Sequence, residues 1–222
     1  MWTWLQSASQ YIPLIFSLLF IGVLFWYRVL RFSRIYGRSP INTPRSNDYS
    51  AHALLSRLLL VSFVLAILLA SLAAFWPAVL ERLDLLYEHR RTTLLGPGIV
   101  LAVIAALLVW RGQADMAASW RIGIDTAERT PLVTRGLFGF CRNPIYLGLQ
   151  VGMVSFFLML PGYLTLILLL QGLMLLHVQT RLEEEYLLRC HQAKYVEYCA
   201  AVGRFVPLAG RWRKATNTTG AR

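Results

Sequence analysis

Long apolar runs recur along this 222-residue chain and restrict its fold more than any other feature. They lie near residues 11–30, 54–80, 94–110, 145–160 and 163–188, and most approach the roughly 20 apolar residues that a helix needs to cross a bilayer. Charged residues make up only 15% of the chain, whereas soluble domains carry about 25%. The sequence therefore predicts an all-α integral membrane protein with about five transmembrane helices.

The distribution of basic residues predicts how the chain is oriented. Only three of the 22 Lys and Arg residues lie in the loop 81–91, while nineteen lie in the first loop, in residues 111–142 and in the C-terminal region. The positive-inside rule then places the N-terminus outside and the C-terminus in the cytoplasm, in an inner (cytoplasmic) membrane or an endomembrane. Because the basic residues flank apolar runs, the net charge of +11 indicates a bilayer as the partner and no nucleic acid.

Polar segments divide the chain into three parts. Residues 1–110 hold the first three apolar runs. Residues 111–208 are predicted to be the functional core, with an interfacial helix, a helical hairpin closed at Pro161-Gly162 and a charged cytoplasmic extension. Residues 209–222 are basic and rich in Thr, which predicts a disordered tail.

Three local patterns refine these elements. Trp76-Pro77 predicts that the second run ends or kinks there, because proline disfavours a helical conformation in the residue before it. Gly148 and Gly152 form a GxxxG pattern, which favours the close approach of a partner helix. Residues 111–141 mix acids, bases and Trp, and their first part predicts a lateral helix at the membrane interface.

Polar side chains bracket the predicted hairpin. Arg142 and Tyr146 lie at the start of its first helix, and Gln179 and Glu183 lie four residues apart on its second, followed by Glu184. When the hairpin closes, these groups meet at the cytoplasmic mouth of an apolar cleft, where they need partners from the protein or a ligand. Taken alone, Arg142 also suits a contact with lipid phosphates, and consecutive glutamates also suit a solvated helix face. The His and Cys residues lack metal-ligand spacing, so no metal site is predicted.

Several motifs follow one another in a fixed order along residues 113–208. They are Leu132-Val133-Thr134-x-Gly136, Arg142-Asn143-Pro144-x-Tyr146-x-Gly148, Glu183-Glu184-x-x-Leu187, Tyr195-x-x-Tyr198 and Arg204-Phe205-x-Pro207. This order resembles the isoprenylcysteine carboxyl methyltransferase family, to which phospholipid N-methyltransferases are related. The resemblance implies a membrane enzyme that holds S-adenosylmethionine in a cytoplasmic pocket beside a lipid-accessible cleft.

Carried over by position, the resemblance assigns a role to individual residues. It implies that eight residues bind the cofactor: Leu132, Val133, Phe138, Asn143, Pro144, Ile145, Tyr146 and Glu183. Gln179 and Arg181 are the candidate substrate residues, and Gln179 stands where eukaryotic members have an arginine that contacts the substrate carboxylate. Arg142 and Glu184 are the candidate catalytic residues, with Glu184 as the base that an amine acceptor would require.

The resemblance implies methyl transfer from S-adenosylmethionine to a lipidic or prenylated acceptor. Aromatic faces such as that of Tyr146 suit the cofactor's sulfonium, and the carboxylate of Glu183 suits its amino and hydroxyl groups. Two other classes stay open. A sterol-reductase-like, NADPH-dependent membrane oxidoreductase shares a Tyr-x-Gly turn but often has an acid where this chain has Leu149. A non-enzymatic scaffold or small transporter would leave the polar cluster without a role.

Overall fold

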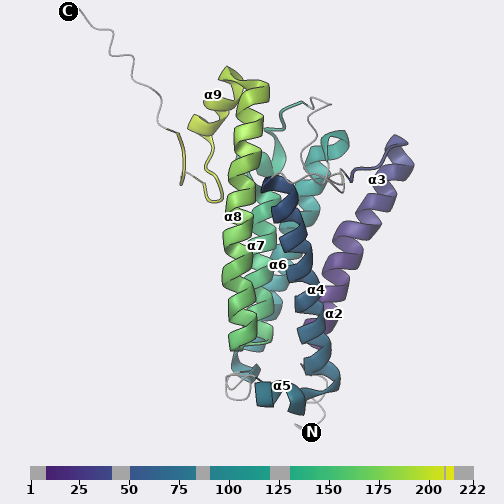
Figure 1. Ribbon diagram of the computed structural model, residues 1–222. Helices are drawn as coiled ribbons and strands as arrows, with labels where there is room; N and C mark the ends of the chain where they lie inside the picture. Colours follow the sequence, from purple (N-terminus) through teal and green to yellow (C-terminus); the bar gives the residue numbers. More distant parts are fainter. Residues whose placement is uncertain (1–8, 42–50, 84–90, 121–130, 208, 213–222) are drawn as a thin grey trace, which may run out of the picture.

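The computed structural model describes residues 9–41, 51–83, 91–120, 131–207 and 209–212. Within these ranges the chain is almost entirely helical, and its long helices run side by side (Figure 1). The helices are α2 (Ile12–Ile21), the π-helical η1 (Gly22–Tyr27), α3 (Arg28–Tyr36), α4 (Ala51–Phe75), α5 (Pro77–Leu83), α6 (Arg91–Met116), α7 (Pro144–Met159), α8 (Tyr163–His191) and α9 (Ala193–Ala201). Two short 3-10 turns, η2 (Ala117–Ser119) and η3 (Gly136–Gly139), lie between α6 and α7.

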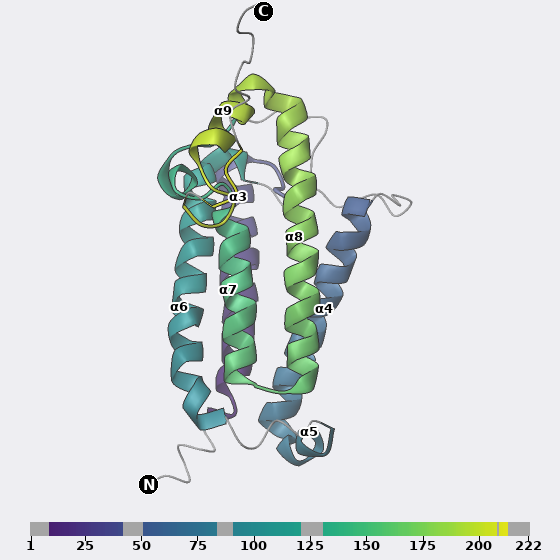
Figure 2. The ribbon, with the colours of Figure 1, turned by 90° about the vertical axis from the view of Figure 1, so that its left-hand side faces the viewer.

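Four helical segments of the described chain are long and apolar enough to cross a membrane. They are Ile12–Tyr36, Ala53–Phe75, Thr93–Ser119 and Tyr163–His191. Helix α7 is apolar but has only 16 residues, or about 24 Å at 1.5 Å per residue. It lies between α6 and α8 (Figure 2). The predicted all-α membrane fold is confirmed, and the count of five crossing helices stays a prediction.

The third apolar run is longer than the sequence predicted. The prediction ended this run at Trp110, whereas α6 continues to Met116. One reason is that Gln113 finds a partner on another helix, since its Nε2 donates to the carbonyl oxygen of Leu24 at 2.9 Å. The prediction of an interfacial helix is therefore wrong for residues 111–116, and residues 121–130 lie outside the described residues.

The two predicted helix breaks are confirmed. Helix α4 ends at Phe75 and α5 begins at Pro77. The hairpin of α7 and α8 turns at Pro161-Gly162, where the Thr165 hydroxyl donates to the carbonyl oxygens of Leu160 at 2.6 Å and Gly162 at 3.1 Å. Both ends of this turn are thereby fixed to the first turn of α8.

The glycines of α7 allow its close approach to α6 and α2. A Cβ at Gly148 would lie 2.7 Å from Cγ2 of Val109 and 3.1 Å from the carbonyl oxygen of Ala105, both on α6. A Cβ at Gly152 would lie 3.2 Å from the ring of Phe20 on α2. The partner helix of the GxxxG pattern is therefore mainly α6, and helices meet closely because small residues let their backbones approach.

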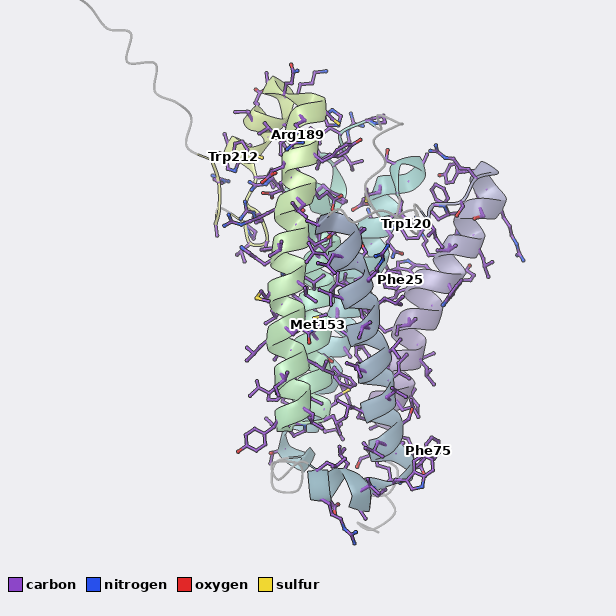
Figure 3. The ribbon with its side chains drawn as sticks, in the orientation of Figure 1. Phe25, Phe75, Trp120, Met153, Arg189 and Trp212 are labelled. Atoms are coloured by element: carbon purple, nitrogen blue, oxygen red, sulfur yellow. The ribbon has the colours of Figure 1, made fainter. Side chains whose placement is uncertain are left out.

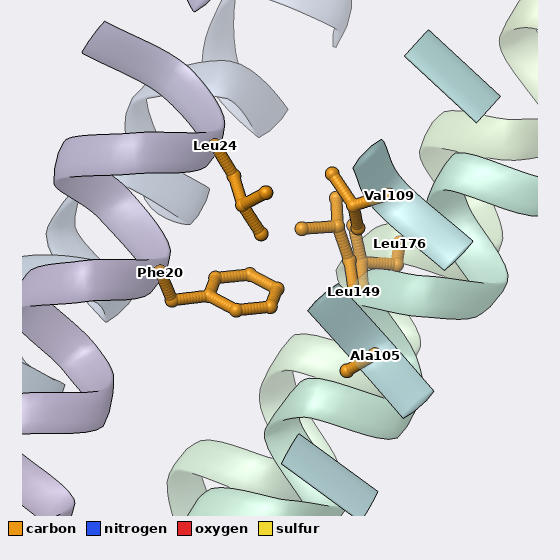
Figure 4. Close-up of a cluster of buried hydrophobic side chains, with 6 residues drawn as sticks. All are labelled: Phe20, Leu24, Ala105, Val109, Leu149 and Leu176. Atoms are coloured by element: carbon orange, nitrogen blue, oxygen red, sulfur yellow. The ribbon is translucent and has the colours of Figure 1, made fainter. Parts of the chain in front are cut away.

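An apolar cluster joins four helical segments at the centre of the bundle (Figure 4). Its buried members are Phe20, Leu24, Ala105, Val109, Leu149 and Leu176. Three or four residues further toward the α9 end of the bundle, each segment carries a polar residue. These are Arg28, Gln113, Tyr146 and Gln179, which we call the polar layer. We call the cluster of six buried residues the apolar floor. It lies one helical turn below the polar layer.

Candidate functional site

Helix α7 begins at the end of the bundle where α8 meets α9 (Figures 1 and 2). Pro144 occupies its first turn, where the missing N–H costs little. Asn143 stands at the N-cap but does not cap the helix, because its Nδ2 donates to Oε1 of Glu184 at 2.9 Å and to the carbonyl oxygen of Arg204 at 3.3 Å. The first-turn N–H groups of α7 consequently have no side-chain cap, and the helix dipole adds partial positive charge there.

The C-terminal segment runs back to the start of α7. We call residues 203–207 and 209–212 the terminal strap. The backbone N–H of Arg142 donates to the carbonyl oxygen of Gly203 at 2.9 Å, and that of Asn143 donates to Arg204 at 3.2 Å. Trp212, beside α9 in Figure 3, donates its backbone N–H to Cys199 at 3.0 Å. The described part of the predicted disordered tail is thus attached to α9, while residues 213–222 lie outside the described residues.

Glu184 is the centre of a buried charge cluster. Its Oε1 accepts from Nε of Arg142 at 3.1 Å and from Asn143, and its Oε2 accepts from Nε and Nη2 of Arg204 at 2.9 and 2.7 Å. The side chains of Arg142 and Glu184 are only 1% and 4% exposed. Four hydrogen bonds occupy the four lone-pair positions of the carboxylate. This geometry favours a positioning role for Glu184 over that of a base.

Arg142 also donates to backbone carbonyl oxygens and does not point into an open pocket. Its Nη1 donates to the carbonyl oxygens of Val202 at 2.6 Å and Cys199 at 3.2 Å. Its Nη2 donates to Gly210 at 3.2 Å. The guanidinium therefore joins Glu184 on α8 to the end of α9 and to the terminal strap. Arg142, too, is placed to position its neighbours.

A second polar group lies where α7 faces α8. The side chain of Tyr146 lies within interaction distance of those of Glu183 and Gln179. Gln179 is buried, whereas Tyr146 and Glu183 are half-buried. The structure thus brings together three of the residues that the sequence predicted to bind cofactor or substrate. Arg181 is exposed and donates its Nε to Nε2 of His177 at 3.1 Å, so it lies on another face of α8.

The segment before α7 completes this end of the molecule. Phe138 is buried, and its carbonyl oxygen accepts from the Tyr198 hydroxyl at 2.6 Å. Burial raises the pKa of the Tyr198 phenol still further above neutral pH, and the protonated hydroxyl is the donor of this bond. Leu132 packs against the buried residues of α9, and Val133 is half-buried. Their contacts with a cofactor stay predictions.

Arg204 is the member of the site to which the sequence alone gave no role. It is 20 residues from Glu184 and shares no helix with it. Helical spacing could not connect the two residues, because that rule applies only within one helix. The signal that could have found it is the Arg204-Phe205-x-Pro207 motif, the last part of the family resemblance.

An apolar cavity that is open on one side adjoins the apolar floor. It lies between α2, α4, α7 and α8, and its lining includes Phe16, Phe20, Phe63, Leu149, Met153 and Phe156. Apolar linings of this kind suit a hydrocarbon chain. The cavity and the polar layer are therefore complementary to the two parts of an amphiphile.

Comparisons with known proteins agree with the sequence motifs. Residues 98–189 match the sequence model of the isoprenylcysteine carboxyl methyltransferase (ICMT) family, so the family predicted from the motifs is confirmed over this range. The solved structure of the eukaryotic intramembrane Ras methyltransferase ICMT is similar, with a TM-score of 0.51 and 17% sequence identity. The similarity covers 85% of this chain and 63% of that chain, so this chain matches less than two thirds of that protein. No curated protein sequence matches the chain.

The matched range has a clear boundary in the structure. It begins at Gly98 in α6 and ends at Arg189 near the end of α8. It contains Arg142, Tyr146 and Glu183, but neither α9 nor the terminal strap. Arg204, whose side chain contacts Glu184, thus lies outside the matched range.

Proposed function

We propose that this protein is an integral membrane methyltransferase that transfers a methyl group from S-adenosylmethionine to a lipidic or prenylated acceptor. The observation that carries the proposal is the Tyr146, Glu183 and Gln179 group beside the uncapped start of α7. This group lies within the range that matches the methyltransferase family. We place the site at the cytoplasmic face, where the distribution of basic residues puts this end of the bundle.

The residues present fit the polar groups of the cofactor. The carboxylate of the cofactor suits the first-turn N–H groups of α7, which no side chain caps. The guanidinium groups of Arg142 and Arg204 share one carboxylate, that of Glu184. The surplus positive charge also favours the carboxylate of the cofactor. Glu183 suits an amino group or ribose hydroxyls, and the ring of Tyr146 suits a sulfonium. Leu132, Val133 and Phe138 are the candidates for contact with the adenine.

The residues of this chain would act by binding the cofactor and the methyl acceptor and by orienting them toward each other. S-adenosylmethionine, when bound, supplies an electrophilic methyl group. Correct alignment and exclusion of water can provide a large part of the rate enhancement of such a transfer. The apolar floor below Tyr146 keeps water from one side of the site. Because the lone pairs of Glu184 are occupied, an acceptor that needs no deprotonation, such as a carboxylate, suits the site better than an amine.

The hydrocarbon part of the acceptor would occupy the cavity between α2, α4, α7 and α8. Leu149 both lines this cavity and belongs to the apolar floor. It lies on α7 one turn from Tyr146. A chain in the cavity could therefore present its polar end to the polar layer without leaving the bundle.

We expect Tyr146→Ala and Glu183→Ala each to weaken the binding of S-adenosylhomocysteine by about tenfold or more. Each change removes hydrogen bonds that involve a charged group, which contribute about 1.5–3 kcal/mol. Isothermal titration of the purified, detergent-solubilised protein would measure this loss. Glu185→Ala is the matched control, because Glu185 is exposed and pairs only at 3.8 Å with exposed Arg189 among the described residues.

The same preparation separates the three classes of function. Stabilisation by NADPH with no response to S-adenosylhomocysteine would favour the oxidoreductase, and no response to either would favour the scaffold or transporter. Undiminished binding in both alanine variants would refute the assignment of Tyr146 and Glu183.

A further inference from the structure

Arg28 is a half-buried cation with no acidic partner among the residues that the structure describes. It stands at the start of α3, and its Nη2 donates to the backbone carbonyl of Gln113 at 2.7 Å. Its guanidinium lies 5.6 Å from the ring centroid of Trp120, which Figure 3 labels between α3 and α6. None of the ion pairs between described residues includes it. An ionisable residue within a membrane-spanning segment indicates a functional site.

Two buried atoms here lack a hydrogen-bond partner within the described chain, namely Nε of Arg28 and Oε1 of Gln113. Gln113 is only 1% exposed. The orientation of its amide is fixed, because Nε2 donates to Leu24 and a flipped amide would set Oε1 against that carbonyl oxygen. An unpartnered donor and an unpartnered acceptor are thus held on facing helices. Leaving both unpaired costs their desolvation, so a ligand that pairs with them gains both bonds without breaking any.

The pair lies next to the helix turn proposed to bind the cofactor. A Cβ at Gly112, the neighbour of Gln113, would lie 2.8 Å from Cγ1 of Ile145 and 3.5 Å from Pro144. Ile145 also packs against the buried cluster that contains Trp120. One turn below Arg28, Leu24 belongs to the apolar floor, whose Phe20 and Leu149 line the cavity. The pair therefore lies beside the cofactor turn and one helical turn from the apolar floor that borders the cavity.

We propose that Arg28 and Gln113 bind the polar head of the methyl acceptor. In this arrangement an anionic oxygen of the head, from a carboxylate or a phosphate, accepts from Nε of Arg28. An N–H or O–H group of the same head donates to Oε1 of Gln113, and the hydrocarbon chain extends into the cavity. The identity of this ligand as the acceptor rests on the proposed function. The existence of a site for an anionic head does not.

The test uses the full chain in an uncharged detergent and three amphiphilic probes. N-dodecanoylglycine carries a carboxylate and an N–H group, its methyl ester lacks the charge, and lysophosphatidylethanolamine carries a phosphate and an ammonium group. We expect the wild type to bind at least one of the two anionic-oxygen probes about tenfold or more tightly than the ester. In Gln113→Glu, the new carboxylate would pair with Arg28 and repel the head. We expect that variant to lose this preference.

Two further variants make the result specific. Arg28→Lys keeps the positive charge but lacks Nε, and it should weaken binding of the anionic-oxygen probe as Gln113→Glu does. Arg34→Gln removes an equal charge from an exposed position of α3 and should stay within about twofold of the wild type. Thermal melting of each variant excludes misfolding as the cause.

Equal binding of N-dodecanoylglycine, lysophosphatidylethanolamine and the ester, or unchanged binding by Gln113→Glu, would overturn the proposal and leave a buried water as the partner of the two atoms. In the methyl-transfer assay, a raised KM with little change in kcat in Arg28→Lys would support the acceptor as the ligand. An unchanged KM together with co-purified phospholipid would overturn the identification of the ligand as the methyl acceptor. The ligand of Arg28 and Gln113 would then be a bilayer lipid. S-adenosylhomocysteine binding, measured on the same samples, tests the proposed function separately, because failure to bind it would leave the head-binding result intact.

Discussion

Glu184→Gln is expected to destabilise the folded protein by about 3–5 kcal/mol, the usual cost of removing one partner from a buried ion pair. The substitution keeps the size of the side chain but removes the charge that Arg142 and Arg204 share. It also turns an amide N–H group toward a guanidinium donor, which replaces an attraction with a repulsion. Arg142 is too deeply buried to regain solvation, since its side chain is 1% exposed.

Glu185→Gln provides the matched control for this change. Its ion pair with Arg189 is 3.8 Å long, and the two side chains are 62% and 81% exposed. Exposed pairs of this kind contribute about 0–1 kcal/mol, so the stability should hardly change. Thermal or denaturant unfolding in detergent would compare the two variants. Equal stability of both variants would contradict the role given to Glu184 as the centre of the cluster.

Gly136→Ala is expected to cost about 2–4 kcal/mol, from a left-handed backbone conformation and from overpacking. Gly136 has φ +62°, which alanine adopts only at a cost, and an added Cβ would collide with the carboxylate of Asp115. That carboxylate cannot easily move away. Its Oδ2 accepts from the backbone N–H of Leu137 at 2.8 Å, and its Oδ1 pairs with Arg111 at 3.1 Å.

Gly139→Ala tests whether the cost is specific to Gly136. The two glycines bound the same 3-10 turn. A Cβ at Gly139 would meet only the carbonyl oxygen of Thr134, at 3.5 Å, which is an ordinary contact. We expect this variant to melt within a few degrees of the wild type and to bind S-adenosylhomocysteine normally. Similar melting of the two variants would show that Asp115 yields to the added methyl group.

Elements that depend on nearby residues could be predicted from the sequence. The break at Trp76-Pro77 and the turn at Pro161-Gly162 follow from local backbone chemistry, and both occur in the structure. The end of α6 could not be predicted this way. Gln113 looks like an interfacial residue in sequence, but its amide pairs with Leu24, 89 residues away. Long-range hydrogen bonds of this kind leave no periodic signal.

The candidate site shows the same limit. The proximity of Tyr146, Glu183 and Gln179 follows from one hairpin and from spacing along a helix, so it could be predicted. The role of Glu184 could not, because its four bonds involve donors that are 42, 41 and 20 residues away in the chain. A carboxylate next to a predicted ligand suggested a base in the sequence. Its surroundings in three dimensions indicate instead a residue that holds others in place.

The pairing of the terminal strap with the start of α7 also determines when the site can form during biosynthesis. The ribosome makes α7 and α8 before residues 199–210, which supply the carbonyl oxygens that Arg142 needs. The hairpin can therefore enter the bilayer while Arg142 and Glu184 still lack some of their final partners. The buried cluster around Arg142 and Glu184 is completed only after the last of these residues leaves the ribosome. Insertion of the hairpin and completion of the Arg142 contacts are thus separate events, and the second requires residues 199–210 to have been made.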